Sequence, residues 1–136
     1  MNYSRFTVIL SAVVLAVLAV TCSEKNPPRD EIPRVKDTMA RLEEAIKSKN
    51  PNGIDSLMSS GARRLGYSPE QIMTDVCADT VSGSFYTFGK REFFYTKDKA
   101  MVRFRIMIDS SDTGRPAEIT LVKDRNQWLV KRFDLR

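Results

Sequence analysis

The 136-residue chain contains no histidine. Histidine is the commonest general base near neutral pH and a frequent ligand of transition metals. Its absence excludes catalytic pairs of the Ser-His and Cys-His types and metal centres built on imidazole. We therefore predict no metal ion and no cofactor. The composition also argues against catalysis, although enzymes that use only Asp, Glu, Tyr or Lys remain open.

Long hydrophobic runs are nearly absent as well. The exception spans residues 6–20, with Thr7 and Ser11 as its only polar members. Arg5 adds a positive charge before this run and small residues follow it, a pattern typical of a secretory signal peptide. As a helix the run would be about 22 Å long, shorter than the roughly 30 Å hydrocarbon core of a bilayer. We predict a signal peptide over residues 1–21, with a permanent spanning helix as the alternative.

Cysteine is scarce, since only Cys22 and Cys77 are present. Cys22 directly follows the apolar run, and Leu18-Ala-Val-Thr-Cys22 resembles the lipobox of bacterial lipoproteins. The resemblance implies cleavage before Cys22 and attachment of a diacylglyceryl group to its thiol. Several acyl chains, at about 0.8 kcal/mol per buried CH₂, hold a domain stably at a membrane. The alternative is an ordinary signal peptide that ends near a cysteine.

The lipobox and the composition that follows it predict the domain organisation. Residues 22–31 are polar and proline-containing, as expected for a lipidated cysteine with a flexible tether. Residues 32–136 have the length of a single domain with one core. The predicted location is exported and membrane-anchored on the extracytoplasmic side of a bacterial envelope, in the outer membrane or facing the periplasm. Once Cys22 is acylated, Cys77 has no intrachain disulfide partner, and its apolar neighbours favour a buried hydrophobe.

The net charge of +5 is unevenly distributed. Residues 90–136 contain 12 basic and 7 acidic side chains, whereas residues 22–89 contain 9 and 10. The C-terminal part is therefore basic. This indicates either a surface for an anionic partner or a solvated face whose lysines discourage aggregation through strand edges. Export argues against nucleic acid as the partner.

Apolar residues at helical spacing predict a first helix from about Asp30 to Ser48. The charged side chains of this helix, including Glu43, are predicted to lie on its other faces. Their pattern does not indicate a functional site. The predicted inward stripe consists of Ile32, Val35, Met39, Leu42 and Ile46.

Two shorter helices are predicted downstream. Asn50-Pro51 has the capping residue and the proline of a helix start, and Gly61 would end that helix. The sequence Ser68-Pro-Glu-Gln71 is a clearer start signal, for a helix that runs to about Ala78. Residues 61–67 are then expected to form a loop.

Strict alternation over residues 100–109 predicts a strand with one buried face. Val102, Phe104, Ile106 and Ile108 point to that face. Three further runs, residues 85–96, 116–123 and 127–135, have strand character, and Gly89 suggests a bulge in the first of them. Short turns make neighbouring strands antiparallel, so these four form a meander. Helices followed by such a sheet indicate an α+β fold, with N-terminal helices packed on a curved antiparallel sheet.

Two short segments carry a resemblance to a known fold family. Asn52-Gly-Ile-Asp-Ser-Leu57 is similar to a short family helix, and residues 121–130, ending in Trp128 and Val130, are similar to the closing strands. In these features the chain resembles the nuclear transport factor two-like superfamily, of the polyketide cyclase and ketosteroid isomerase type with a cystatin-like fold. The resemblance implies a cone-like α+β barrel, in which enzymes of the superfamily place Asp, His or Tyr in the cavity between helices and sheet.

Polar residues that would line the mouth of such a cavity are few. The candidates for a pocket rim are Tyr67, Asp79, Tyr86 and Tyr95. Each is also explained as an amphipathic core residue or as a polar group at a helix end. No convergent pair of carboxylates is evident, and no catalytic motif of the superfamily transfers to this chain.

The outward side of the 100–109 strand offers a different kind of surface. It presents Met101, Arg103, Arg105 and Met107, and both residue types are enriched at protein interfaces. Because proteins of this fold often dimerise through the sheet, we expect a homodimer contact or the binding of an envelope protein here. The alternative is a solvated face whose arginines pair with Glu118 or Asp134 across the strands.

These observations predict a lipid-anchored, non-enzymatic envelope domain that binds a partner protein or a hydrophobic small ligand. One alternative is a small pocket enzyme of the dehydratase or isomerase type. Another is an envelope assembly or structural factor that acts through the basic face of the sheet.

Overall fold

The computed structural model describes residues 31–77, 87–108 and 113–136. Four helices come first: α2 (Glu31–Lys47), α3 (Pro51–Ser56), α4 (Ser60–Arg64) and α5 (Pro69–Cys77). Four strands follow: β1 (Thr87–Tyr95), β2 (Lys99–Met107), β3 (Arg115–Asp124) and β4 (Gln127–Leu135). The fold is therefore α+β, with the helices before the sheet, as the sequence predicts. The predicted signal peptide and Cys22 lie outside the described residues.

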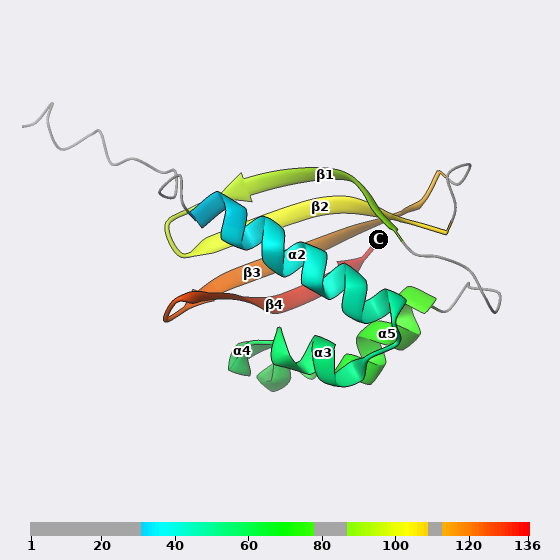
Figure 1. Cartoon of the computed structure of the whole chain (residues 1–136), viewed down its shortest axis with the longest axis horizontal. Coiled ribbons are helices and arrows are strands. Elements are labelled where there is room, and N and C mark those ends of the chain that lie inside the picture. Colours follow the sequence, from blue (N-terminus) through cyan, green and yellow to red (C-terminus); the bar gives the residue numbers. More distant parts are fainter. Residues whose placement is uncertain (1–30, 78–86, 109–112) are drawn as a thin grey trace, which may run out of the picture.

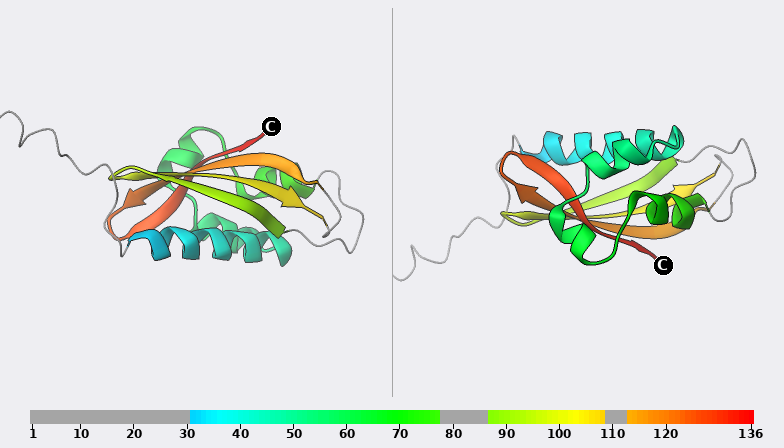
Figure 2. Two further views of the ribbon diagram at one scale, coloured as in Figure 1. Left: turned by 90° about the horizontal axis from the view of Figure 1, so that it is seen from above. Right: turned by 90° about the horizontal axis from the view of Figure 1, so that it is seen from below.

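The four strands form one open antiparallel sheet in the order β1-β2-β3-β4. A register shift between Gly89 and Glu92 marks the bulge that Gly89 predicts, and Lys90 adopts a positive φ of 49° there. The helix α2 runs along one face of the sheet, while α3, α4 and α5 lie beside β4 (Figures 1 and 2). We call the face under α2 the inner face and the opposite one the outer face.

The core lies between α2 and the inner face. The stripe residues Val35, Met39, Leu42 and Ile46 are fully buried, whereas Ile32 at its start is only half-buried. Opposite them, β2 contributes a buried series that ends in Phe104 and Ile106. The ring centroid of Phe104 lies 4.4 Å from that of Phe88 and 6.3 Å from that of Phe133. Aromatic and aliphatic side chains therefore fill the space between helix and sheet.

The segment between α3 and α5 differs from the expected loop. The helix α3 already ends at Ser56, and Leu57 and Ser59 then pair with Val130 at the edge of β4. The Ser59 hydroxyl accepts a hydrogen bond from the Ala62 amide at 3.1 Å and so caps the short helix α4. Gly61 lies inside α4 rather than at the end of a helix. The prediction failed there because the serine cap outweighed the glycine signal.

None of the described helices is long and apolar enough to cross a lipid bilayer.

We predict that Phe104→Ala lowers the free energy of unfolding by about 3–5 kcal/mol, because the cavity lies where three rings meet. Urea denaturation monitored by circular dichroism measures this loss. Leu65→Ala is the control, since Leu65 is 59% exposed and its truncation should change stability by no more than about 0.5 kcal/mol. An equally small effect of Phe104→Ala would contradict the packing described above.

Candidate functional site

The expected pocket rim is not assembled by the residues that the structure describes. Asp79 and Tyr86 lie outside them. The Tyr67 hydroxyl donates a hydrogen bond to Asp134 Oδ1 at 3.4 Å, and Asp134 belongs to the outer face. Tyr95 instead points to the inner face, where its ring stacks on that of Phe93 at a centroid distance of 6.0 Å. The two tyrosines thus lie at opposite edges of the sheet, Tyr67 beside β4 and Tyr95 on β1.

Burial governs the chemistry of Tyr95. Its hydroxyl is buried and has no hydrogen-bond partner within the described part of the chain. Desolvation raises the pKa of this phenol above its ordinary value of 10.0. At neutral pH a phenol with a raised pKa is almost entirely protonated, so Tyr95 is not placed to accept a proton there.

The four predicted interface residues do share the outer face of β2, but neighbours in the same chain engage most of them. Arg103 Nε donates to Glu118 Oε2 at 3.0 Å, and its guanidinium lies 5.0 Å from the ring centroid of Phe94. Arg105 donates to the carbonyls of Thr113 and Gly114 at 2.5 and 2.8 Å.

The two methionines of this row differ in their surroundings. Met107 fills the space left open by the missing side chain of Gly89, where a Cβ would overlap its thioether. Met101 is half-buried. The Arg103–Glu118 pair is the cross-strand alternative that the sequence left open, and the positive charge of this face is partly neutralised.

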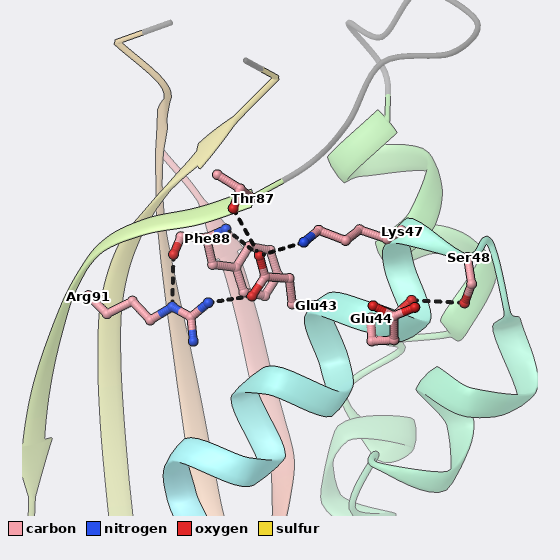
Figure 3. Close-up of polar contacts among 7 residues, drawn as sticks. All are labelled: Glu43, Glu44, Lys47, Ser48, Thr87, Phe88 and Arg91. Carbon is pink, nitrogen blue, oxygen red and sulfur yellow. Dashed lines mark hydrogen bonds and ion pairs between the residues drawn. The ribbon is translucent and has the colours of Figure 1, made fainter. Parts of the chain in front are cut away.

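Glu43 forms a buried polar centre that the sequence analysis missed by placing this residue on a solvent-facing side. Its side chain lies between α2 and β1 (Figure 3), and the residue is only 8% exposed. Oε1 accepts hydrogen bonds from the Thr87 hydroxyl and the Phe88 amide, both at 3.1 Å. Lys47 Nζ lies 3.2 Å from the same oxygen, and the guanidinium of Arg91 binds Oε2.

These contacts keep Glu43 ionised. Burial by itself raises the pKa of its carboxyl group. The hydrogen bonds from the Phe88 amide and from Lys47, with the positive charges of Arg91 and Lys47, outweigh that effect. The pKa of Glu43 is therefore lower than its ordinary value of 4.5.

Glu31 is a second buried carboxylate, at the other end of α2. Its Oε1 accepts a hydrogen bond from Lys123 Nζ at 2.6 Å, and its Oε2 accepts one from Trp128 Nε1 at 2.7 Å. The hydrogen bond from Lys123, then that from Trp128, lowers the pKa of Glu31 more than burial raises it. Position 31 continues the stripe of Val35 and Met39 at a spacing of four, which is the sequence signal that would have revealed it.

The two carboxylates do not form an acid–base pair. They are 12 positions apart on one helix, which separates them by about 18 Å along its axis. Each is held as an anion by cations of its own, so neither is poised to give or take a proton near neutral pH. Within the described ranges, no group of three or more Cys, Asp or Glu residues is placed to hold a metal ion.

A groove runs along α2, and its other wall is formed by the C-terminal end of α3, the turn before β4 and the start of β4. We call it the groove between α2 and α3. Its volume is about 550 Å³. A second hollow of about 240 Å³ continues it along α2, and Arg41, Ser56 and Leu57 line both. Trp128 and Leu57 are almost fully buried and form part of the lining. The other residues of the larger hollow are Pro33, Arg34, Asp37, Thr38, Asn126, Gln127 and Leu129.

The groove has a fixed frame and a mixed polar rim. The Thr38 hydroxyl donates to the carbonyl of Trp128 at 3.1 Å, which fixes α2 against β4. Along the rim, α2 presents the exposed side chains of Arg34, Asp37 and Arg41. Such a surface offers hydrogen bonds and charges of both signs around a small apolar floor. It contains no histidine and no buried carboxylate that could serve as a base.

The polar centre at Glu43 predicts a specific pH dependence. Because the pKa of Glu43 is lower in the folded protein, its stabilising effect is present above about pH 4.5 and is lost as the pH falls through the folded pKa. Glu43→Gln should lower the free energy of unfolding by about 1–3 kcal/mol at pH 7, and this difference should shrink on acidification. Urea denaturation at a series of pH values measures it.

The neighbouring exposed residue provides the control for that experiment. Glu44 lies on the solvent side, and among the described residues its backbone carbonyl, not its carboxylate, accepts a hydrogen bond from Ser48. Glu44→Gln should therefore leave both the stability and its pH dependence close to those of the unmodified protein. A destabilisation of Glu43→Gln that stayed constant from pH 7 to pH 3 would contradict the ionic role of Glu43.

Comparison with known proteins supports the architecture. No protein-family model matches the chain, and no curated protein matches it. Among solved structures, it resembles the crystal structure of a protein of unknown function with a cystatin-like fold from Nostoc punctiforme. The TM-score is 0.61 at 10% sequence identity, over 81% of this chain and 92% of that one. The likeness shows a cystatin-like fold, the kind of α+β cone that nuclear transport factor two-like proteins share.

Proposed function

We propose that this protein is a non-enzymatic binding domain, anchored in a bacterial envelope through a lipidated Cys22, that holds a segment of a partner protein in the groove between α2 and α3. The observation that carries the proposal is the position of the hollow. Side chains around Phe104 fill the space under α2, whereas the groove lies outside it, along the flank of α2 that faces α3. Ligand access is therefore at the surface and not within the cone.

The lining of the groove favours a protein segment over a hydrophobic small molecule. Pockets for small molecules are mostly apolar and enclose most of the ligand. Here Arg34, Asp37 and Arg41 form one rim, while Trp128 and Leu57 lie in the floor. Protein interfaces combine a small apolar centre with a polar rim in the same way.

The outer face of the sheet is a weaker candidate for partner binding. Arg103 and Arg105 already bind acceptors of the same chain. A partner that needed these charges would first have to break those contacts.

The lipid anchor would place the groove close to a membrane. Residues 23–30 separate Cys22 from the first turn of α2, and eight residues extend over about 28 Å at most. Pro33 and Arg34, in that same first part of α2, line the groove. A partner bound there would be either membrane-bound or adjacent to the membrane.

Replacing the anchoring residue tests the first half of the proposal. We predict that Cys22→Ser moves the protein from the membrane fraction to the soluble or unprocessed pool, because no acyl chain can be attached. Fractionation of cells and intact-mass spectrometry measure the change. Cys77→Ser is the matched control and should leave the fractionation unaltered, since Cys77 packs against the core from α5. Unchanged mass and location of Cys22→Ser would rule lipidation out.

Site-specific photo-crosslinking in the native envelope tests the second half. A photoreactive amino acid at Gln127, which lines the groove, should give a discrete adduct with one protein. The same probe at Glu70, an exposed residue on α5, is the control and should not give this adduct. Introducing Arg41→Glu should reduce the Gln127 adduct at least about threefold, because it reverses a charge on the rim. Equal adducts at both positions, or an adduct insensitive to Arg41→Glu, would count against the groove.

A further inference from the structure

The two edges of the sheet are closed to different degrees. At the β4 edge, the Val130 amide donates to the Leu57 carbonyl at 2.7 Å, and the Val130 carbonyl accepts from the Ser59 amide at 2.8 Å. At the β1 edge, the Phe88 amide donates to Glu43 and the Phe88 carbonyl accepts from Arg91 at 2.8 Å (Figure 3). Side chains thus occupy the hydrogen-bonding positions of an incoming strand beside the first part of β1.

None of the described residues protects the last part of β1 in this way. The Thr96 amide donates a hydrogen bond to the Lys99 carbonyl at 2.8 Å, across the turn between β1 and β2. The backbone groups of Thr96 therefore point toward β2. In an antiparallel ladder alternate residues point this way, so Phe94 also faces β2. The amide and carbonyl groups of Phe93 and Tyr95 consequently point to the free edge. No hydrogen bond from residues 31–77, 87–108 or 113–136 reaches them.

Aromatic rings flank this open edge on both faces of the sheet. On the outer face Phe94 is 44% exposed, one of two large hydrophobic side chains with such exposure among the described residues. On the inner face Phe93 is half-buried, and the ammonium group of Lys36 lies 5.8 Å from its ring centroid. An added strand would gain apolar contacts on both faces in addition to backbone hydrogen bonds.

The charges around the edge indicate the chemistry of that strand. Lys36, Lys97 and Lys99 are exposed and form no ion pair within the described residues. Glu92 and Asp98 are the carboxylates of β1 and of the turn that follows it. Asp37, next to Lys36, lines the groove on the other flank of α2, so the charge balance at the edge is positive. From this we infer that the edge from Glu92 to Tyr95 is a docking site for an extended segment of a partner protein in which acidic and apolar side chains alternate.

A second copy of this chain fits the edge less well. Two β1 edges paired about Phe94 would place Lys97 of one copy opposite Arg91 of its partner, and like charges directly opposite destabilise strand pairing. The lysines therefore disfavour self-association while they attract an acidic strand. This site is on the flank of α2 opposite to the groove, so it is independent of the function proposed above.

A defined peptide pair tests the inference. The probes are two fluorescein-labelled hexapeptides, one of alternating Val and Glu and one of alternating Val and Lys, titrated against the full-length chain in detergent micelles. Fluorescence anisotropy should show binding of the Glu peptide at least about tenfold tighter than that of the Lys peptide. Methylating every backbone nitrogen of the Glu peptide should abolish binding, because neither of its edges can then donate hydrogen bonds to the sheet.

Two variants on α2 separate the edge from the groove. Lys36→Glu should lower the affinity of the protein for the Glu peptide about three- to tenfold. Arg41→Glu, on the groove flank, should leave this affinity unchanged. Equal melting temperatures of the variants and the parent protein confirm that both fold. If the Gln127 cross-link is absent but the Glu peptide binds, the function proposed for the groove is rejected and the edge site stands. If the cross-link forms but the peptide does not bind, the edge site is rejected and the groove stands.

Amide exchange locates the contact. The Phe93 and Tyr95 amides should exchange rapidly in the free protein and become protected when the Glu peptide binds. Protection already present in the free chain would overturn the inference, because the edge would then be occupied by the protein itself. A dimer in light scattering that disappears with Phe94→Lys would overturn it in favour of a second copy.

Discussion

The contact on which the structure depends is the packing of α2 against the inner face of the sheet. A four-stranded sheet with one apolar face is not stable when that face is exposed to water. Val35, Met39, Leu42 and Ile46 cover it and are themselves fully buried. Each such side chain contributes roughly 1.5–3 kcal/mol, so together they are comparable with the whole net stability of a small domain. Phe104 and its aromatic neighbours occupy the space between α2 and the described strands.

Two carboxylates determine how α2 lies on that face. Glu31 binds Lys123 and Trp128 in the last two strands, and Glu43 binds Arg91 and the Phe88 amide in the first. Buried ion pairs add little net stability, since desolvation offsets much of the attraction, but removing one partner is costly. Their effect is therefore mainly positional. An apolar stripe alone tolerates sliding of the helix along its axis, whereas two anions held at opposite ends of the sheet do not.

The elements that follow from local patterns were predictable, and the polar contacts were not. Alternation in β2 predicts Phe104 inward and Arg103 outward because side chains in a strand have a period of two. The bulge at Gly89 and the capped start of α5 also have local signals. Glu43 has none that identifies Arg91 as its partner, since the two are 48 positions apart in the sequence and meet only after β1 docks on α2. Of the predicted pocket rim, Asp79 and Tyr86 lie outside the described residues. Tyr67 and Tyr95 lie at opposite edges of the sheet, which their separation in the sequence does not reveal.

The rotation of α2 about its axis connects the core with both proposed binding surfaces. At 3.6 residues per turn, Lys36 and Arg41 lie about 140° apart around the helix, on either side of the buried stripe. Lys36 reaches the open edge of β1, and Arg41 reaches the groove beside α3. A rotation of the helix by one residue, about 100°, would bury one of these side chains and draw both away from their surfaces. The buried stripe and the two anchored carboxylates prevent it, so the residues that stabilise the fold also hold both surfaces in place.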